Sequence, residues 1–252
     1  MPGHDVRVAD IALPGGFVST VVRIGDTVRR TMPGNAAFVH RLLDFFAERG
    51  WAGAPRFLGT DELGREVLSY LDGHVAWETE QPPDVWSERS LTQIAGLVRE
   101  FHDLTAGSTL AGDAEVVCHN DLSPKNTVYR DLGTGLQPVA FIDWDLVTPG
   151  RRVHDVAFMC WQYLDLGPGI TEVSDAVSGI RMLCDAYRLA ERSDLVETIL
   201  WWQDRCWRGI QASAAAGTPS GLALRDAGVI TDVRNAWQWV RGHRDRLDAE
   251  VR

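Results

Sequence analysis

The chain has 252 residues, 45% of them hydrophobic and 24% charged, a globular mixture that excludes a disordered tail, a collagen and a disulfide miniprotein. Its net charge of −10 argues against nucleic acid as a partner, and the absence of an uncharged apolar run of about 18 residues argues against a membrane span. We expect a cytoplasmic protein with reduced cysteines, because the first residues lack the apolar core of a signal peptide and the four cysteines form no C-x-x-C pair.

Two hairpins are predicted near the start of the chain. β-Branched residues flank Gly25-Asp26 and predict a first hairpin over residues 17–30. A second pair of short strands is expected over residues 56–60 and 65–71, joined by a turn at residues 61–64. These strands predict a small sheet.

A helix is predicted between the two hairpins, over residues 36–49. Asn35 is the expected N-cap and Gly50 the expected end of this helix. Its apolar residues recur every three or four positions, so one face should be buried. The residues expected on that face are Phe38, Leu42, Phe45 and Phe46.

The remainder of the chain is predicted to be mostly helical. Asp72-Gly73 would end the small unit, which divides the chain into an N-terminal lobe, residues 1–72, and a C-terminal lobe, residues 73–252. Ser87 should cap the start of a helix that runs to about residue 104. His102 would lie at the C-terminal end of this helix, where the helix dipole favours a histidine. Later helices are expected over residues 155–164, 172–190, 194–215 and 232–250.

Three oxygen-bearing side chains lie close to the two ends of a predicted hairpin between these helices. Asp121 and Asn126 are five residues apart across a proline-bearing loop, and Asp143 follows the apolar strand 139–142. A hairpin over residues 127–142 would bring Asn126 next to Asp143. Amide and carboxylate oxygens are ligands for Mg²⁺, and a free carboxylate can orient a hydroxyl and accept its proton. The pattern therefore favours phosphoryl transfer.

The motifs H-x-D-x-x-x-x-N, from His119 to Asn126, and I-D-W-D, residues 142–145, carry a family resemblance. They resemble the aminoglycoside phosphotransferase and choline kinase family, a branch of the protein-kinase-like fold. The resemblance covers roughly residues 13–166. It implies an α+β fold with two lobes, a small β-rich N-terminal lobe and a larger, mostly helical C-terminal lobe.

The resemblance also implies roles for individual residues. Asp121 would be the catalytic base, and Asn126 and Asp143 would bind Mg²⁺. His119 would support the loop backbone, and Asp155 would anchor the loop through hydrogen bonds. The expected contacts of the nucleotide, ATP or GTP, are Gly15, Gly16, Arg30 and the backbones of Ser69 and Leu71.

The sequence departs from the kinase pattern at the phosphate-binding lysine. Of 25 basic residues only Lys125 is a lysine, so Arg29 or Arg30 must take this role, and strand alternation favours Arg30. The helix over residues 36–49 also offers no well-placed glutamate, although His40 lies near that position. Lys125 is either a solvated loop residue or a contact of the γ-phosphate or acceptor.

We therefore expect a Mg²⁺-dependent kinase that phosphorylates a hydroxyl group of a small molecule, with an aminoglycoside or another natural product as first candidate. Acceptors of a choline-like or peptide Ser/Thr type are the alternative, as is a non-catalytic nucleotide-binding or immunity protein of the same fold. An acidic rim of Asp165, Glu172 and Asp175 could attract a cationic acceptor, or could simply be solvated. The motifs leave the acceptor's identity, the choice between ATP and GTP, and the oligomeric state open.

Overall fold

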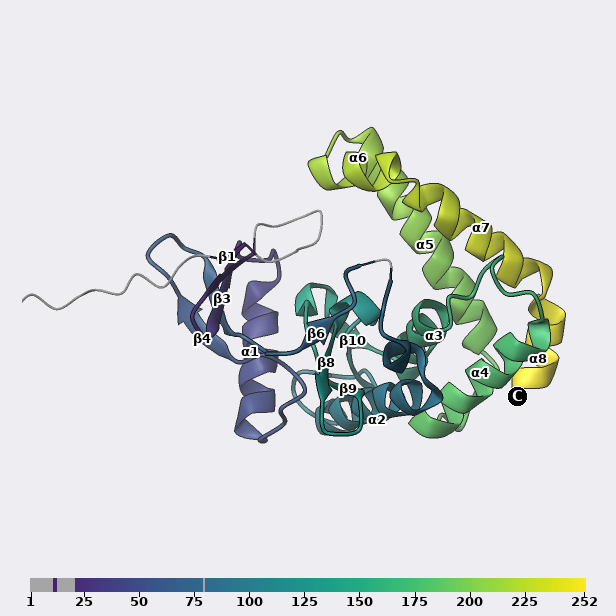
Figure 1. Ribbon diagram of the computed structural model, residues 1–252, viewed down its shortest axis with the longest axis horizontal. Helices are drawn as coiled ribbons and strands as arrows, with labels where there is room; N and C mark the ends of the chain where they lie inside the picture. Colours follow the sequence, from purple (N-terminus) through teal and green to yellow (C-terminus); the bar gives the residue numbers. More distant parts are fainter. Residues whose placement is uncertain (1–10, 13–20, 79) are drawn as a thin grey trace, which may run out of the picture.

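The computed structural model describes residues 11–12, 21–78 and 80–252. A small sheet with one helix lies beside a larger, mostly helical part (Figure 1), which confirms the expected α+β kinase-like architecture. Gly15 and Gly16 lie outside the described residues. Among the helices described, none is both long and apolar enough to cross a membrane.

The small sheet is antiparallel and has the strand order β1-β2-β3-β5-β4. The predicted first hairpin is confirmed over its described residues, with Gly25 at φ +59° in the turn, a conformation open to glycine. Its strands are β1 Ile11–Ala12, β2 Val22–Ile24, β3 Thr27–Arg30, β4 Phe57–Thr60 and β5 Glu66–Ser69.

Helix α1, Ala36–Glu48, covers the sheet and confirms the predicted helix within one residue. Its buried face is slightly rotated from the prediction, because Val39 and Leu43 are fully buried where Phe38 and Phe45 are only partly so. Asn35 occupies the N-cap position, but its side chain makes no capping hydrogen bond, which corrects the predicted cap.

The two parts of the chain share one hydrophobic core. The ring of Phe46 on α1 lies 4.7 Å from that of Trp51 and 5.3 Å from that of Trp144, between ring centroids. Phe101, from the larger part, completes this aromatic cluster at 6.4 Å from Phe46. Burial of such rings contributes strongly to stability. The division of the chain at residues 72 and 73 stays a prediction.

Helix α2, Glu88–Thr105, begins as predicted. The Ser87 hydroxyl accepts a hydrogen bond from the backbone N–H of Ser90 at 3.2 Å, which satisfies one of the free N–H groups of the first turn. One face of α2 is buried in the core through Leu91, Ile94, Val98 and Phe101.

The substitution Ser87→Ala is expected to lower the free energy of unfolding by about 1 kcal/mol, because the Ser90 N–H loses its capping partner. Asn35→Ala is the matched control at the start of α1. Since Asn35 makes no capping bond, its replacement should change stability by less than about 0.5 kcal/mol. Urea denaturation of both variants checks the difference, and equal losses would contradict it.

Two small sheets hold the loop that carries the motif. Strands β6 His74–Val75, β8 Thr127–Asp131 and β9 Leu136–Phe141 form one, and β7 Val116–Cys118 and β10 Thr148–Gly150 form the other. The predicted hairpin is present as β8 and β9, paired from Thr127↔Phe141 onward. One end of this hairpin therefore faces the loop between β7 and β8.

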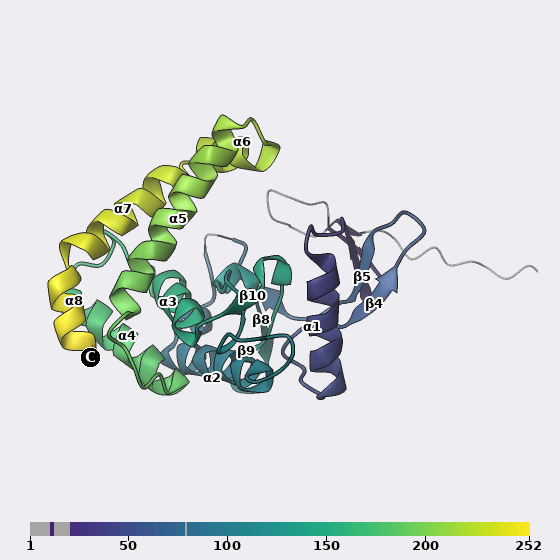
Figure 2. The same ribbon diagram turned by 180° about the vertical axis from the view of Figure 1, so that it is seen from behind.

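The C-terminal helices are packed as an arm (Figures 1 and 2), with α5 and α7 side by side and α6 at the far end. The prediction of a single helix over residues 232–250 is wrong, because the helix is interrupted at His243. The His243 N–H donates to the carbonyls of Trp239 and Val240 and so closes the first of the two helices. Helix α6 was not predicted. The helices are α3 Arg152–Tyr163, α4 Val173–Tyr187, α5 Leu195–Ala215, α6 Pro219–Asp226, α7 Val229–Gly242 and α8 Arg244–Val251.

Candidate active site

The loop between β7 and β8 brings Asp121 and Asn126 into direct contact. The Asn126 Nδ2 amide donates to the Asp121 backbone carbonyl and to its carboxylate Oδ2, both at 2.8 Å. Both amide protons are used in this way, so Asn126 Oδ1 is left as an acceptor for another group. The contact also restrains the Asp121 side chain.

Asp121 lies where its carboxylate can hold a proton near neutral pH. Burial is the main cause and raises the pKa of Asp121 to about 6. The carboxylates of Asp143 and Asp145 act in the same direction, while Lys125 and the Asn126 amide oppose them. Perturbation of this kind is frequent at functional sites.

Asp143 lies next to Asn126, as the hairpin predicted. The backbone N–H of Ile142 donates to the Asn126 carbonyl at 2.9 Å, and Asp143 follows with φ +61°, a conformation in which Asn and Asp are enriched among non-glycine residues. His119 supports this end of the strand, because its Nε2 donates to the Ile142 carbonyl at 3.1 Å. The His119 ring also packs against the Trp144 ring, with 4.5 Å between the two ring centroids.

Arg30 extends from β3 to the same group of carboxylates. Its guanidinium contacts Glu66, lies 3.3 Å from Asp143 Oδ1 and also contacts Asp145. Although burial opposes the charge, these carboxylates raise the pKa of Arg30 above its usual value. Arg29 points elsewhere and donates to Thr27 Oγ1 at 2.6 Å.

Glu66 is a site residue that the sequence did not reveal. It lies directly opposite Arg30 in the β3–β5 pair and is fully buried. It also bonds His40 Nε2 at 2.9 Å. The sequence offers no well-placed glutamate on α1, and in the structure the carboxylate beside Arg30 comes from β5 instead. The sequence did carry one signal for this residue, because Glu66 stands at the start of an apolar strand and a buried glutamate needs a charged or hydrogen-bonding partner.

The site has the charge and the donor atoms for a divalent cation. Its charged groups are Glu66, Asp121, Asp143, Asp145, Arg30 and Lys125. Four carboxylates against two cations leave a charge of −2 when all are ionised. The oxygens of Asn126 and Asp143 are hard ligands of the kind that Mg²⁺ takes. The residues present therefore fit a magnesium ion.

The strand β5 ends at the expected nucleotide contacts. The Ser69 N–H donates to the Arg56 carbonyl at 2.9 Å, so this backbone N–H is already used within the sheet. Leu71 lies two residues further and is half-buried. These two contacts stay a prediction.

A cavity of about 630 Å³ opens beside the loop. Its lining residues are Ala76, Glu78, Gln81, Trp86, Ser123, Pro124, Lys125, Gln162, Tyr163, Leu164 and Asp165. Of the predicted acidic rim, Asp165 lines this cavity, whereas Glu172 and Asp175 do not. Glu78 adds a carboxylate that the sequence did not single out, and Trp86, which also lines the cavity, is 46% exposed.

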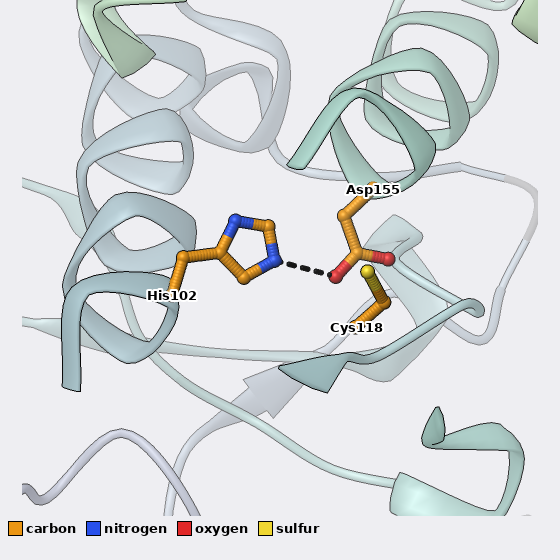
Figure 3. Close-up of side chains that lie close together, drawn as sticks. All are labelled: His102, Cys118 and Asp155. Carbon is orange, nitrogen blue, oxygen red and sulfur yellow. Dashed lines mark hydrogen bonds and ion pairs between the residues drawn. The ribbon is translucent and has the colours of Figure 1, made fainter. Parts of the chain in front are cut away.

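Asp155 lies beneath the loop and binds its backbone. Its carboxylate accepts from the N–H groups of His119 at 2.7 Å and Asn120 at 2.8 Å, and it lies 3.0 Å from His102 Nε2 (Figure 3). His102 lies in the last turn of α2, as expected from the sequence, and is fully buried there. Hydrogen bonds, above all those of His102, hold the pKa of Asp155 below its usual value despite burial.

Cys118 completes a cluster with His102 and Asp155 whose ligand atoms lie within 4.8 Å of one another. The Asp155 oxygens already accept three hydrogen bonds. Burial raises the pKa of the Cys118 thiol far above its usual value, and its Sγ donates to the Arg151 carbonyl. A cysteine binds a metal ion as the thiolate, and the Cys118 thiol keeps its proton, so this cluster is better explained as structural.

Comparison with known proteins places this loop in a described family. A family model named "Phosphotransferase enzyme family" matches residues 108–190, the stretch that contains Asp121, Asn126 and Asp143. A trifolitoxin immunity protein of Rhizobium leguminosarum bv. trifolii is 30% identical over an alignment of 267 positions, which covers 96% of this chain and 98% of that protein.

Two solved structures are similar in fold. A choline/ethanolamine kinase family protein from Mesorhizobium loti matches with a TM-score of 0.57 and 16% identity over 92% of both chains. An aminoglycoside phosphotransferase from Streptomyces rimosus, in complex with ADP and streptomycin, matches with a TM-score of 0.57 and 14% identity, over 79% of this chain and 92% of that one. Both support the kinase-like fold.

Proposed function

Because the chain belongs to the phosphotransferase enzyme family, we propose that it transfers a phosphoryl group from Mg²⁺-ATP or Mg²⁺-GTP to a hydroxyl group of a small molecule. The observation that carries this proposal is the convergence of Asp121, Asn126 and Asp143 at one end of the β8–β9 hairpin. A second part of the chain, β3, brings the cation Arg30 to the same place.

The residues divide the work of phosphoryl transfer, which needs positioning and charge neutralisation more than covalent chemistry. Asn126 Oδ1 and Asp143 would hold Mg²⁺, which would neutralise charge on the nucleotide phosphates. Arg30 would steady these phosphates. Asp121, restrained by Asn126, would accept a hydrogen bond from the acceptor hydroxyl and take its proton as the hydroxyl attacks.

The cavity beside the loop supports a cationic acceptor. Glu78 and Asp165 supply two carboxylates and Lys125 one positive charge, while Trp86 offers an aromatic face on which a cation could lie. An aminoglycoside or another amine-bearing natural product fits this lining. The structure of the Streptomyces rimosus relative contains streptomycin, which makes this class the first to screen.

A thermal shift with nucleotide tests the proposal. Mg²⁺-ATP or Mg²⁺-GTP at 100 times its dissociation constant should add about 2.7 kcal/mol, which is roughly 5–10 °C for a chain of this size. Asp143→Asn should remove most of the Mg²⁺-dependent part, and asparagine tolerates the positive φ at this position. No shift at millimolar nucleotide would overturn the proposal.

Arg30→Gln is expected to raise the dissociation constant of Mg²⁺-nucleotide about 10- to 100-fold, because a charge-assisted hydrogen bond contributes about 1.5–3 kcal/mol. Arg29→Gln is the matched control on the same strand and should change it less than about twofold, since Arg29 faces Thr27 and Asp61. Calorimetric titration well below the melting temperature gives both values. The opposite ranking would assign the phosphates to Arg29.

A non-catalytic nucleotide-binding or immunity protein is the second candidate. The observation that favours it is the full-length similarity to a trifolitoxin immunity protein. In addition, Arg30 contacts the Asp143 carboxylate, and Mg²⁺ would need this same carboxylate as a ligand. Nucleotide binding without phosphorylation of any hydroxylated acceptor would support this candidate. Release of nucleoside diphosphate that depends on acceptor would exclude it.

A further inference from the structure

The carboxylate of Asp155 binds the backbone of the loop that carries Asp121. Asp155 is in turn linked by hydrogen bonds to His102, Tyr187 and Arg152, in that order. His102 Nε2 lies 3.0 Å from Asp155 Oδ2, and His102 Nδ1 lies 2.7 Å from the Tyr187 hydroxyl. The Arg152 Nη1 group lies 3.1 Å from the same hydroxyl. Together with Asp155, these side chains come from α2, α3 and α4.

The chemistry of these groups sets the direction of every hydrogen bond. The ionised Asp155 carboxylate can only accept, so the proton of a neutral His102 imidazole lies on Nε2 and is donated to Asp155. Nδ1 is then an acceptor and takes the Tyr187 proton, while the Tyr187 oxygen accepts from Arg152, which can only donate. Burial lowers the pKa of His102, in agreement with a neutral ring.

We propose that His102, Tyr187 and Arg152 are positioning residues for phosphoryl transfer. They set the tautomer and orientation of the imidazole, which orients the Asp155 carboxylate toward the N–H groups of His119 and Asn120 and so positions Asp121. The catalytic part of this inference rests on the proposed function. The positioning of the loop backbone does not, because it follows from the contacts alone.

Packing alone is the rival explanation, since the rings of His102 and Tyr187 are buried in the core. The variant Tyr187→Phe separates the two explanations, because it keeps the ring and removes only the hydroxyl that links Arg152 to His102. Tyr129→Phe is the matched control. Tyr129 is equally buried, but its hydroxyl has no hydrogen-bond partner among the described residues.

Hydrogen–deuterium exchange of the peptide from Cys118 to Asp121 is the first measurement. Tyr187→Phe should raise the exchange rate of this peptide about tenfold over wild type, the effect of losing one buried hydrogen bond. Tyr129→Phe should leave it within about twofold. The same rate in both variants would overturn the relay.

Two His102 variants provide a second comparison. His102→Leu should raise the exchange rate of this peptide at least as much as Tyr187→Phe, because Asp155 loses its side-chain donor. His102→Gln can place an amide N–H near the former Nε2 position and should restore part of the protection. Equal exchange in the leucine and glutamine variants would contradict a role for the Nε2–H donor.

Slow hydrolysis of Mg²⁺-ATP or Mg²⁺-GTP by water, in the full chain, tests the catalytic part. Tyr187→Phe should lower kcat about tenfold and leave the nucleotide KM within about twofold, since the nucleotide contacts are untouched. An equal fall for Tyr129→Phe would overturn the catalytic part. If the wild type hydrolyses no nucleotide, the proposed transfer to a hydroxyl acceptor is judged by its own tests, and the exchange comparison decides the relay.

Discussion

Replacement of Asp121 by asparagine is expected to lower kcat for phosphoryl transfer by about 10²–10⁴-fold, the usual contribution of a positioned general base. The amide has nearly the same shape as the carboxylate, so the loop backbone and the contact with Asn126 should be largely retained. The nucleotide KM should change less than about threefold, because no phosphate or metal contact is assigned to Asp121. Steady-state kinetics with the acceptor found by screening gives both constants.

Asp131→Asn is the control for this substitution. Asp131 ends the first strand of the same hairpin, is exposed, and accepts only the N–H groups of its own turn at Gly133 and Gly135. Its replacement should leave kcat unchanged within about twofold. If Asp121→Asn retains more than about a tenth of the wild-type kcat, another group must accept the proton.

Asp155→Asn is expected to lower the free energy of unfolding by about 3–5 kcal/mol, as when one partner of a buried charged network is removed. Asp155 now accepts hydrogen bonds from the N–H groups of His119, Asn120 and His102. In the asparagine variant the amide NH2 would replace one carboxylate oxygen and would face at least one of these donors. For a chain of this length the melting temperature should fall by roughly 10 °C.

The effect of Asp155→Asn should be similar at pH 5 and pH 8. The pKa of Asp155 is depressed in the folded chain, so its stabilisation is fully present above the unfolded value of about 3.9 and is lost only as pH falls through the folded value. Asp103→Asn is the control, because Asp103 is half-exposed in its pairs with Arg99 and Arg152. It should cost less than about 1 kcal/mol. Equal losses would contradict the buried network.

The hairpins and most helices could be predicted because they depend on local patterns, whereas the short strands β1, β6 and β10 were not predicted. The turn at Gly25 and the cap at Ser87 each involve residues within a few positions of one another. The break at His243 could not be predicted in this way, since residues 232–250 continue a helical pattern across it. Asn35 shows the same limit, because its sequence position suits a cap that its side chain does not make.

The sequence by itself determined that Asn126 and Asp143 flank one hairpin, with Asp121 in the loop before it, because strand pairing across a short turn brings the two ends of a hairpin together. Only the tertiary structure showed that Arg30, and not Arg29, reaches Asp143. It also revealed Glu66 as a partner of Arg30 and His102 as a partner of Asp155. The contact from Arg30 to Asp143 spans 113 positions. Such contacts depend on strand register and on burial, and a buried charge must find its partner wherever the fold places one.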